Sequence, residues 1–140
     1  MAATNNNSDP LAELLVDARH VDRQAITEAL RGRVSIDSQS GRPVLLAGYN
    51  HLDAKRKILV VLLSRKAAHL LNVVDNEALT NNEVVHESGL PPGTVASGLK
   101  NLRERRLVGQ EEDRSYLVPN AHLGNVITFI NLHNQGGESA

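Results

Sequence analysis

The sequence predicts a mainly helical domain of the α+β class. A long aliphatic stretch over residues 54–71 has the length and composition of a helix. Two shorter helical patterns follow it, over residues 80–88 and 91–106, and a glycine turn separates them. Short β-prone runs before the long helix and after the helical pair supply the β component.

The N-terminal part predicts two short helices after a polar, Asn-rich tail over residues 1–8 that is expected to be disordered. Asp9 followed by Pro10 is typical of a helix start, and Asp22 caps a second helix that ends at Gly32. Both helices are too short to be stable alone, so they are expected to dock on the rest of the chain. The apolar face of the first comprises Leu11, Leu14, Leu15 and Ala18.

A β-hairpin is predicted next. Residues 34–36 and 44–46 are β-prone, and the loop between them, residues 37–42, is rich in turn formers. Residues 48–51 are expected to form the exit loop. Residues 9–52 together are therefore predicted to be an N-terminal extension made of helices and a hairpin.

The long helix is predicted to begin after Asp53, which can cap it, and to end near Leu71. By periodicity alone, the apolar run Ile58–Leu63 could also be a buried strand, but strong helix formers continue after it. Because apolar residues surround nearly the whole circumference, the helix is expected to be central, covered by its own domain or partly by a second subunit.

Capping and turn residues predict where the two helices of the pair begin and end. Thr80 and Glu83 have the spacing of a capping box, and Gly89 suits the left-handed conformation that ends a helix. Pro91 or Pro92 suits the first turn of the next helix, because an amide there has no helical partner. The apolar face of this second helix comprises Val95, Leu99 and Leu102.

The run from Val84 through Gly89 to Leu102 resembles the helix-turn-helix of the winged-helix DNA-binding superfamily, which includes small MarR-like and ArsR-like prokaryotic regulators. Residues 107–108 and 116–118 resemble the two strands of its wing. The resemblance implies a DNA-binding protein, in particular a transcriptional regulator. Winged helices also serve as protein-binding modules, so an interaction or assembly module without DNA binding is the alternative.

This resemblance covers about residues 53–119 and implies a winged helix-turn-helix domain there. After it, residues 120–133 predict an amphipathic C-terminal helix, and residues 134–140 a disordered polar tail. In winged-helix regulators such a helix often packs against its counterpart, which implies a homodimer. Packing on its own domain is the other possibility.

The outer face of helix 91–106 is expected to enter the major groove of double-stranded DNA, given a rotation of about 100° per residue. Asn101 could pair with adenine, and Lys100 and Arg103 with the DNA backbone. Gly98 in the helix interior costs about 1 kcal/mol relative to Ala. The candidate contacts are Thr94, Ser97, Gly98, Lys100, Asn101 and Arg103, with Arg114 on the wing and Lys55 and Lys57 on the long helix.

The charge of the chain is partly unfavourable for DNA binding. The net charge is −1, and Glu111, Glu112 and Asp113 at the wing tip would repel phosphate. Basic residues nevertheless gather in two segments, residues 55–66 and 100–106. The sequence leaves open whether these two segments share a surface.

No enzyme, metal site or cofactor is predicted. The chain has no cysteine, its six histidines are scattered, and neither a phosphate-binding glycine loop nor a nucleophile elbow is present. No signal peptide pattern occurs, and no apolar run approaches the roughly 20 residues of a membrane span. A soluble cytoplasmic protein without a membrane partner is expected; the sequence does not indicate a small-molecule effector.

Overall fold

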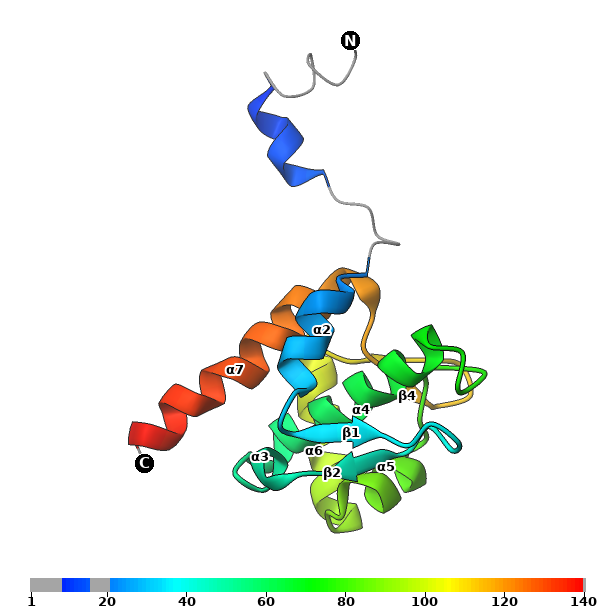
Figure 1. Cartoon of the computed structure of the whole chain (residues 1–140). Helices are drawn as coiled ribbons and strands as arrows, with labels where there is room; N and C mark the ends of the chain where they lie inside the picture. Colours follow the sequence, from blue (N-terminus) through cyan, green and yellow to red (C-terminus); the bar gives the residue numbers. More distant parts are fainter. Residues whose placement is uncertain (1–8, 16–20, 140) are drawn as a thin grey trace.

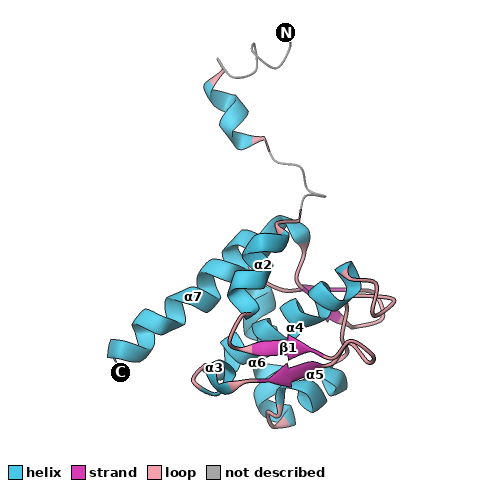
Figure 2. Cartoon of the chain, viewed as in Figure 1, coloured by secondary structure: helices cyan, strands magenta, loops and turns pink. Residues whose placement is uncertain are grey.

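The computed structural model describes residues 9–15 and 21–139, with side chains described as far as Leu132. Within these ranges the chain is mainly helical with short antiparallel hairpins, so the predicted α+β class is confirmed (Figure 2). The tail predicted over residues 1–8 and Ala18 of the first predicted helix lie outside the described residues.

From residue 21 onward the elements surround a long central helix (Figure 1). The α-helices are α2 (Arg23–Leu30), α3 (Ala47–Asn50), α4 (Ala54–Leu70), α5 (Asn81–Ser88), α6 (Pro92–Glu104) and α7 (Leu123–Ser139), and the 3-10 helices are η1 (Pro10–Leu14) and η2 (Asn120–His122). The strands are β1 (Val34–Ile36) paired with β2 (Pro43–Leu45), and β3 (Gly109–Gln110) paired with β4 (Tyr116–Leu117).

Helix α4 is the centre of the core, as its aliphatic composition predicts. It packs against α2, α5, α6, α7 and strands of both hairpins. Every side chain of Ile58–Leu63 has 0% exposure. Elements of the same chain therefore cover the whole circumference, and no second subunit is needed to bury it.

One charged residue of α4 also lies in this core. Lys66 is 1% exposed, and its Nζ donates to Glu77 Oε1 at 2.7 Å and to the Val118 carbonyl at 2.9 Å. A buried ammonium is tolerated only where acceptors replace its water. Lys66 thus joins α4 to the loop before α5 and to the end of the β3–β4 hairpin, and it does not belong to the basic surface that the sequence suggested.

The helical pair α5–α6 has the predicted turn chemistry. The Thr80 amide donates to Glu83 Oε1 at 2.8 Å and the Glu83 amide donates to Thr80 Oγ1 at 3.2 Å, which completes the capping box. Gly89 has φ +75° and ends α5. The Tyr49 hydroxyl of α3 donates to the Ser88 carbonyl at 2.8 Å, and burial raises the pKa of Tyr49. The turn is therefore fixed by its own sequence and by α3.

The hairpin after α6 begins later than predicted. Leu107 and Val108 are buried residues of the turn after α6, and β3 starts at Gly109. Leu79, before α5, exchanges two backbone hydrogen bonds with Tyr116 of β4, at 2.9 and 2.7 Å. The prediction of a strand over 107–108 was wrong because these apolar side chains fill the core rather than extend the ladder.

The N-terminal prediction needs two corrections. The residues after Asp9 form the 3-10 helix η1, not an α-helix, with the Leu11 amide bonded to Asp9 Oδ1 at 2.9 Å. None of the η1 residues is buried, so the leucines are exposed in this structure and the predicted docking is not seen in it. A single turn forms too few hydrogen bonds to offset the cost of helix nucleation. The expected exit loop near Tyr49 contains the short helix α3.

Helix α7 packs on its own domain, since Val126 and Ile130 are fully buried and α7 contacts both α2 and α4. It continues to Ser139, so the disordered tail predicted over residues 134–140 is wrong as far as Ser139. Adding residues to an existing helix needs no new nucleus, and no proline follows Leu132 to stop it. The far end of α7 extends beyond the other helices (Figure 1).

Candidate nucleic-acid interface

Helix α6 has one buried and one open face. The predicted apolar residues Val95, Leu99 and Leu102 are fully buried against the core. The opposite face is exposed at Ser97 and Lys100, and Arg103 is exposed on its flank. Of the other predicted contacts, Thr94 and Asn101 are half-buried at the edge of this face.

Gly98 does not belong to the open face, and its prediction as a DNA contact was wrong. It is buried where α6 crosses α4, and a Cβ built on it would lie 2.5 Å from Ile58 Cδ1. The close approach of the two helices therefore explains a glycine in a helix interior. The sequence could not reveal this role without the position of Ile58.

A double-mutant cycle tests this explanation. Gly98→Ala should leave the free energy of unfolding unchanged or lower it, because displacement of Ile58 offsets a propensity gain of about 1 kcal/mol. In an Ile58→Val background, which lacks Cδ1, the same change should stabilise by about 1 kcal/mol. Gly93→Ala, where nothing lies within 4 Å, is the control and should behave alike in both backgrounds. Urea denaturation measures the effect of each glycine substitution on the free energy of unfolding in both backgrounds. If Gly98→Ala has the same effect in the wild-type and Ile58→Val backgrounds, the explanation is contradicted.

Two arginines from distant segments meet at one ring beside α6. The guanidinium carbon of Arg56 lies 4.1 Å from the centre of the Phe129 ring and that of Arg105 lies 5.5 Å from it. Arg56 Nε also donates to the Phe129 carbonyl at 2.9 Å, and Arg105 Nε donates to Asn101 Oδ1 at 2.8 Å. The basic segments at the start of α4 and the end of α6 thus converge, through Phe129 of α7.

Both arginines belong to the two basic segments of the sequence but were not among the candidate contacts, and their meeting could not be predicted because Phe129 lies in a different part of the chain. A partial signal existed, since Arg105 lies four residues after Asn101 on one helix face. Asn101 is consequently held by Arg105 in this structure, whereas the sequence predicted it to read adenine.

The two lysines that the sequence predicted as DNA contacts on α4 have other neighbours than Arg56. Lys55 and Lys57 are half-buried, and Lys57 Nζ lies 5.4 Å from the centre of the Tyr49 ring. Such a geometry is a cation–π contact with α3. Of the three cations in this turn, Arg56 is the one that the structure places at the Phe129 ring together with Arg105.

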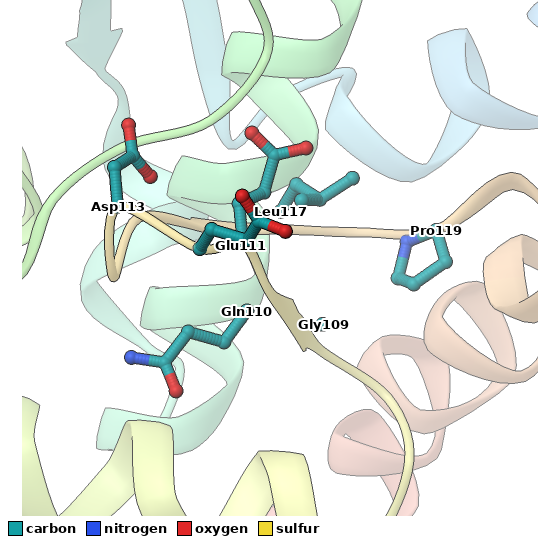
Figure 3. Close-up of a pocket in the computed structure, with 7 residues that line it drawn as sticks. Gly109, Gln110, Glu111, Asp113, Leu117 and Pro119 are labelled. Atoms are coloured by element: carbon teal, nitrogen blue, oxygen red, sulfur yellow. The ribbon is translucent and has the colours of Figure 1, made fainter.

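The β3–β4 hairpin is acidic at its tip. Glu111 and Asp113 line a shallow depression of about 610 Å³ that extends to Pro119 (Figure 3). The Ser115 hydroxyl and amide both donate to Asp113 Oδ1, at 2.6 and 3.0 Å, and these hydrogen bonds lower the pKa of Asp113. The predicted contact Arg114 is exposed beside these carboxylates.

Two exposed arginines, one after α6 and one in the β3–β4 hairpin, have left-handed backbones. Arg114 has φ +70°, and Arg106, directly after α6, has φ +62°. In this conformation a residue with a Cβ costs about 1–2 kcal/mol more than glycine. Elsewhere in the described residues, Asn72 ends α4 with φ +63°, but asparagine tolerates this region better. Strained residues kept at a surface point to a role for the side chain.

Comparison of the chain with protein-family models, curated proteins and solved structures found no match. In the part of the chain that the structure describes, no group of three or more histidine, aspartate or glutamate side chains could hold a metal ion. Within the same residues, none of the helices combines the length and apolar character needed to cross a membrane.

Proposed function

We propose that residues 79–118 together with α4 form a winged helix-turn-helix and that α6 binds double-stranded DNA in the major groove. The element order supports this proposal: α4, the short β-bridge at Leu79, α5, α6 and then the β3–β4 hairpin. Helix α6 is the second helix of the pair, and its outer face has no core contact at Ser97 or Lys100.

One observation carries the proposal: cations surround the C-terminal end of α6. We call Arg103, Arg105 and Arg106, with Arg56 from α4, the arginine cluster. Arg103, Arg105 and Arg106 are exposed, whereas Arg56 shares the Phe129 ring with Arg105 and is ion-paired with Asp53 at 2.6 Å. Such a local concentration of positive charge attracts phosphate even though the net charge of the chain is −1.

The outer face of α6 and the arginine cluster would make different kinds of contact with DNA. Ser97 faces outward and would reach base edges, whereas Lys100 and the exposed arginines of the arginine cluster would contact phosphates on one side of the groove. Asn101 is occupied by Arg105 and contributes indirectly, by orienting that guanidinium. With few side chains available for base readout, specificity would depend on DNA shape and on a second half-site.

Arg106 offers a test that separates stability from binding. Arg106→Gly should raise the free energy of unfolding by about 1 kcal/mol, because glycine relieves the left-handed strain. It should also weaken DNA binding and make the slope of log K against log[salt] shallower by about 1. Asn72→Gly is the control, with a smaller stability gain and unchanged binding. Denaturation and fluorescence titration measure both properties; an unchanged slope for Arg106→Gly would remove Arg106 from the interface.

A salt-dependent titration of the wild-type chain tests the proposed function itself. Labelled duplexes of mixed sequence are titrated between 50 and 200 mM NaCl by fluorescence anisotropy. With roughly four phosphates contacted, log K should fall with log[salt] with a slope of about −3.6. No binding even at the lowest salt concentration would refute DNA binding.

We further propose that the protein acts as a homodimeric transcriptional regulator. Leu132 of α7 is 49% exposed, and α7 continues to Ser139 beyond the other helices (Figure 1). A second copy of α7 could cover this end and place two α6 helices on successive half-sites. Light scattering at high protein concentration tests this directly, and a monomer would exclude it.

The acidic hairpin tip favours the second candidate function, a protein-interaction module. Glu111, Glu112 and Asp113 would meet a basic partner surface well and would be repelled by the DNA backbone. Glu111→Lys and Asp113→Lys distinguish the two functions. They should strengthen DNA binding if the hairpin lies near phosphate, and they should weaken capture of a basic protein partner if the alternative holds.

A further inference from the structure

An apolar groove runs beside α2, away from the features described above. It has a volume of about 310 Å³ and lies between α2, β1 and the C-terminal end of α4. A smaller hollow of about 80 Å³ at the start of α2 shares Ile26, Thr27 and Leu71 with it. Leu71 is 59% exposed at this edge. The groove is lined chiefly by Ile26, Leu30, Val34, Ile36, Leu46 and Leu71.

The same chain carries an apolar segment without a core partner. Leu11, Leu14 and Leu15 are 67%, 75% and 75% exposed, which is high for leucine. Leu11 and Leu14 are three residues apart and therefore lie on one face of the 3-10 helix η1, and Leu15 follows directly after it. We call Asp9–Leu15 the leucine segment.

We propose that the leucine segment docks into the groove of its own chain, antiparallel to α2. Leu15 and Val21 are six Cα–Cα steps apart, which allows a separation of roughly 20 Å. The smaller hollow, which adjoins the groove, begins at Arg23, two residues after Val21. A chain reversal of this length is ordinary between two antiparallel helices. The segment is therefore tethered close to the surface that it would cover.

Charge complementarity supports this occupant and its direction. Arg31 lines the groove at the end of α2, and Arg23 lines the smaller hollow at its beginning. In an antiparallel arrangement Asp9 would lie near Arg31 and Glu13 nearer Arg23. The acidic side chains of the leucine segment would thus meet the basic ends of α2 while its leucines fill the space between them.

Engineered cysteines test this arrangement, since the chain has none of its own. Leu14→Cys combined with Leu71→Cys, both exposed positions, should form a disulfide within one chain under mild oxidation. It should form at least about tenfold faster than the control pair Leu14→Cys with Glu112→Cys, because docking raises the local concentration of the thiols. Non-denaturing chromatography followed by mass spectrometry separates the products.

Each outcome is decisive. A monomer-mass disulfide specific to the Leu71 pair supports docking within the chain. A covalent dimer of the same pair would show exchange between copies, and a rate equal to that of the control pair would show no docking; either overturns the proposal. Arg31→Glu should slow the specific crosslink about threefold and Asp9→Lys should restore it, as expected for one surface ion pair. An unchanged rate would overturn the charge pairing.

Discussion

Lys66→Ala should lower the free energy of unfolding by about 3 kcal/mol, because it removes a buried ammonium and leaves the Val118 carbonyl without its hydrogen bond. The Lys66 ammonium is bonded to both Glu77 and the Val118 carbonyl. Without it, the Val118 carbonyl loses its partner in a buried position, whereas the Glu77 side chain, which is 27% exposed, can be hydrated. Urea denaturation followed by circular dichroism measures the loss.

The neighbouring Arg65 provides the matched control. Arg65→Ala removes the same charge, but Arg65 is half-buried and its Nε bond to the Asn76 carbonyl, at 3.0 Å, is exposed. Arg65→Ala should lower the free energy of unfolding by no more than about 1 kcal/mol. Lys66→Met combined with Glu77→Leu should recover most of the stability, since an apolar pair can replace a buried ionic one. Equal costs for the two alanine variants would show that Lys66 is not effectively buried.

Lys100→Glu combined with Arg103→Glu should weaken DNA binding by roughly 100-fold near 0.1 M salt, since two phosphate contacts become repulsive. The slope of log K against log[salt] should also become shallower by about 2. Both side chains are exposed, so the fold should be preserved. Anisotropy titration gives both quantities.

The control must change the net charge equally. Arg23→Glu combined with Arg31→Glu does so on α2 rather than on α6. It should lower the affinity only slightly, through the longer-range field, and leave the slope nearly unchanged. If the two double variants weaken binding to the same extent, the arginine cluster and α6 are not the binding surface.

The elements that could be predicted from sequence are those determined by local chemistry. The capping box of Thr80 and Glu83 and the left-handed Gly89 depend on residues within one turn, and the structure contains both. Helix α4 was likewise predictable from its length and composition. For η1 the same reasoning failed, because capping by Asp9 starts a helix but only tertiary contacts could stabilise one of this length.

The candidate site depends on contacts between distant residues, and there the sequence was less informative. Helical rotation alone placed Ser97 and Lys100 correctly on the open face of α6. It could not show that Gly98 faces Ile58, nor that Arg56 and Arg105 meet at Phe129. Both relations require the positions of α4 and α7 around α6, which no local pattern encodes.

The Tyr49 hydrogen bond to Ser88 has a consequence for how the molecule unfolds. It links the part of the chain before residue 53 to the turn between α5 and α6. The apolar core is also continuous across that point, from Ile26 of α2 to Ile130 of α7. We therefore expect residues 21–132 to melt as one cooperative unit, so that loosening α2 reduces the order of the helices that would meet DNA.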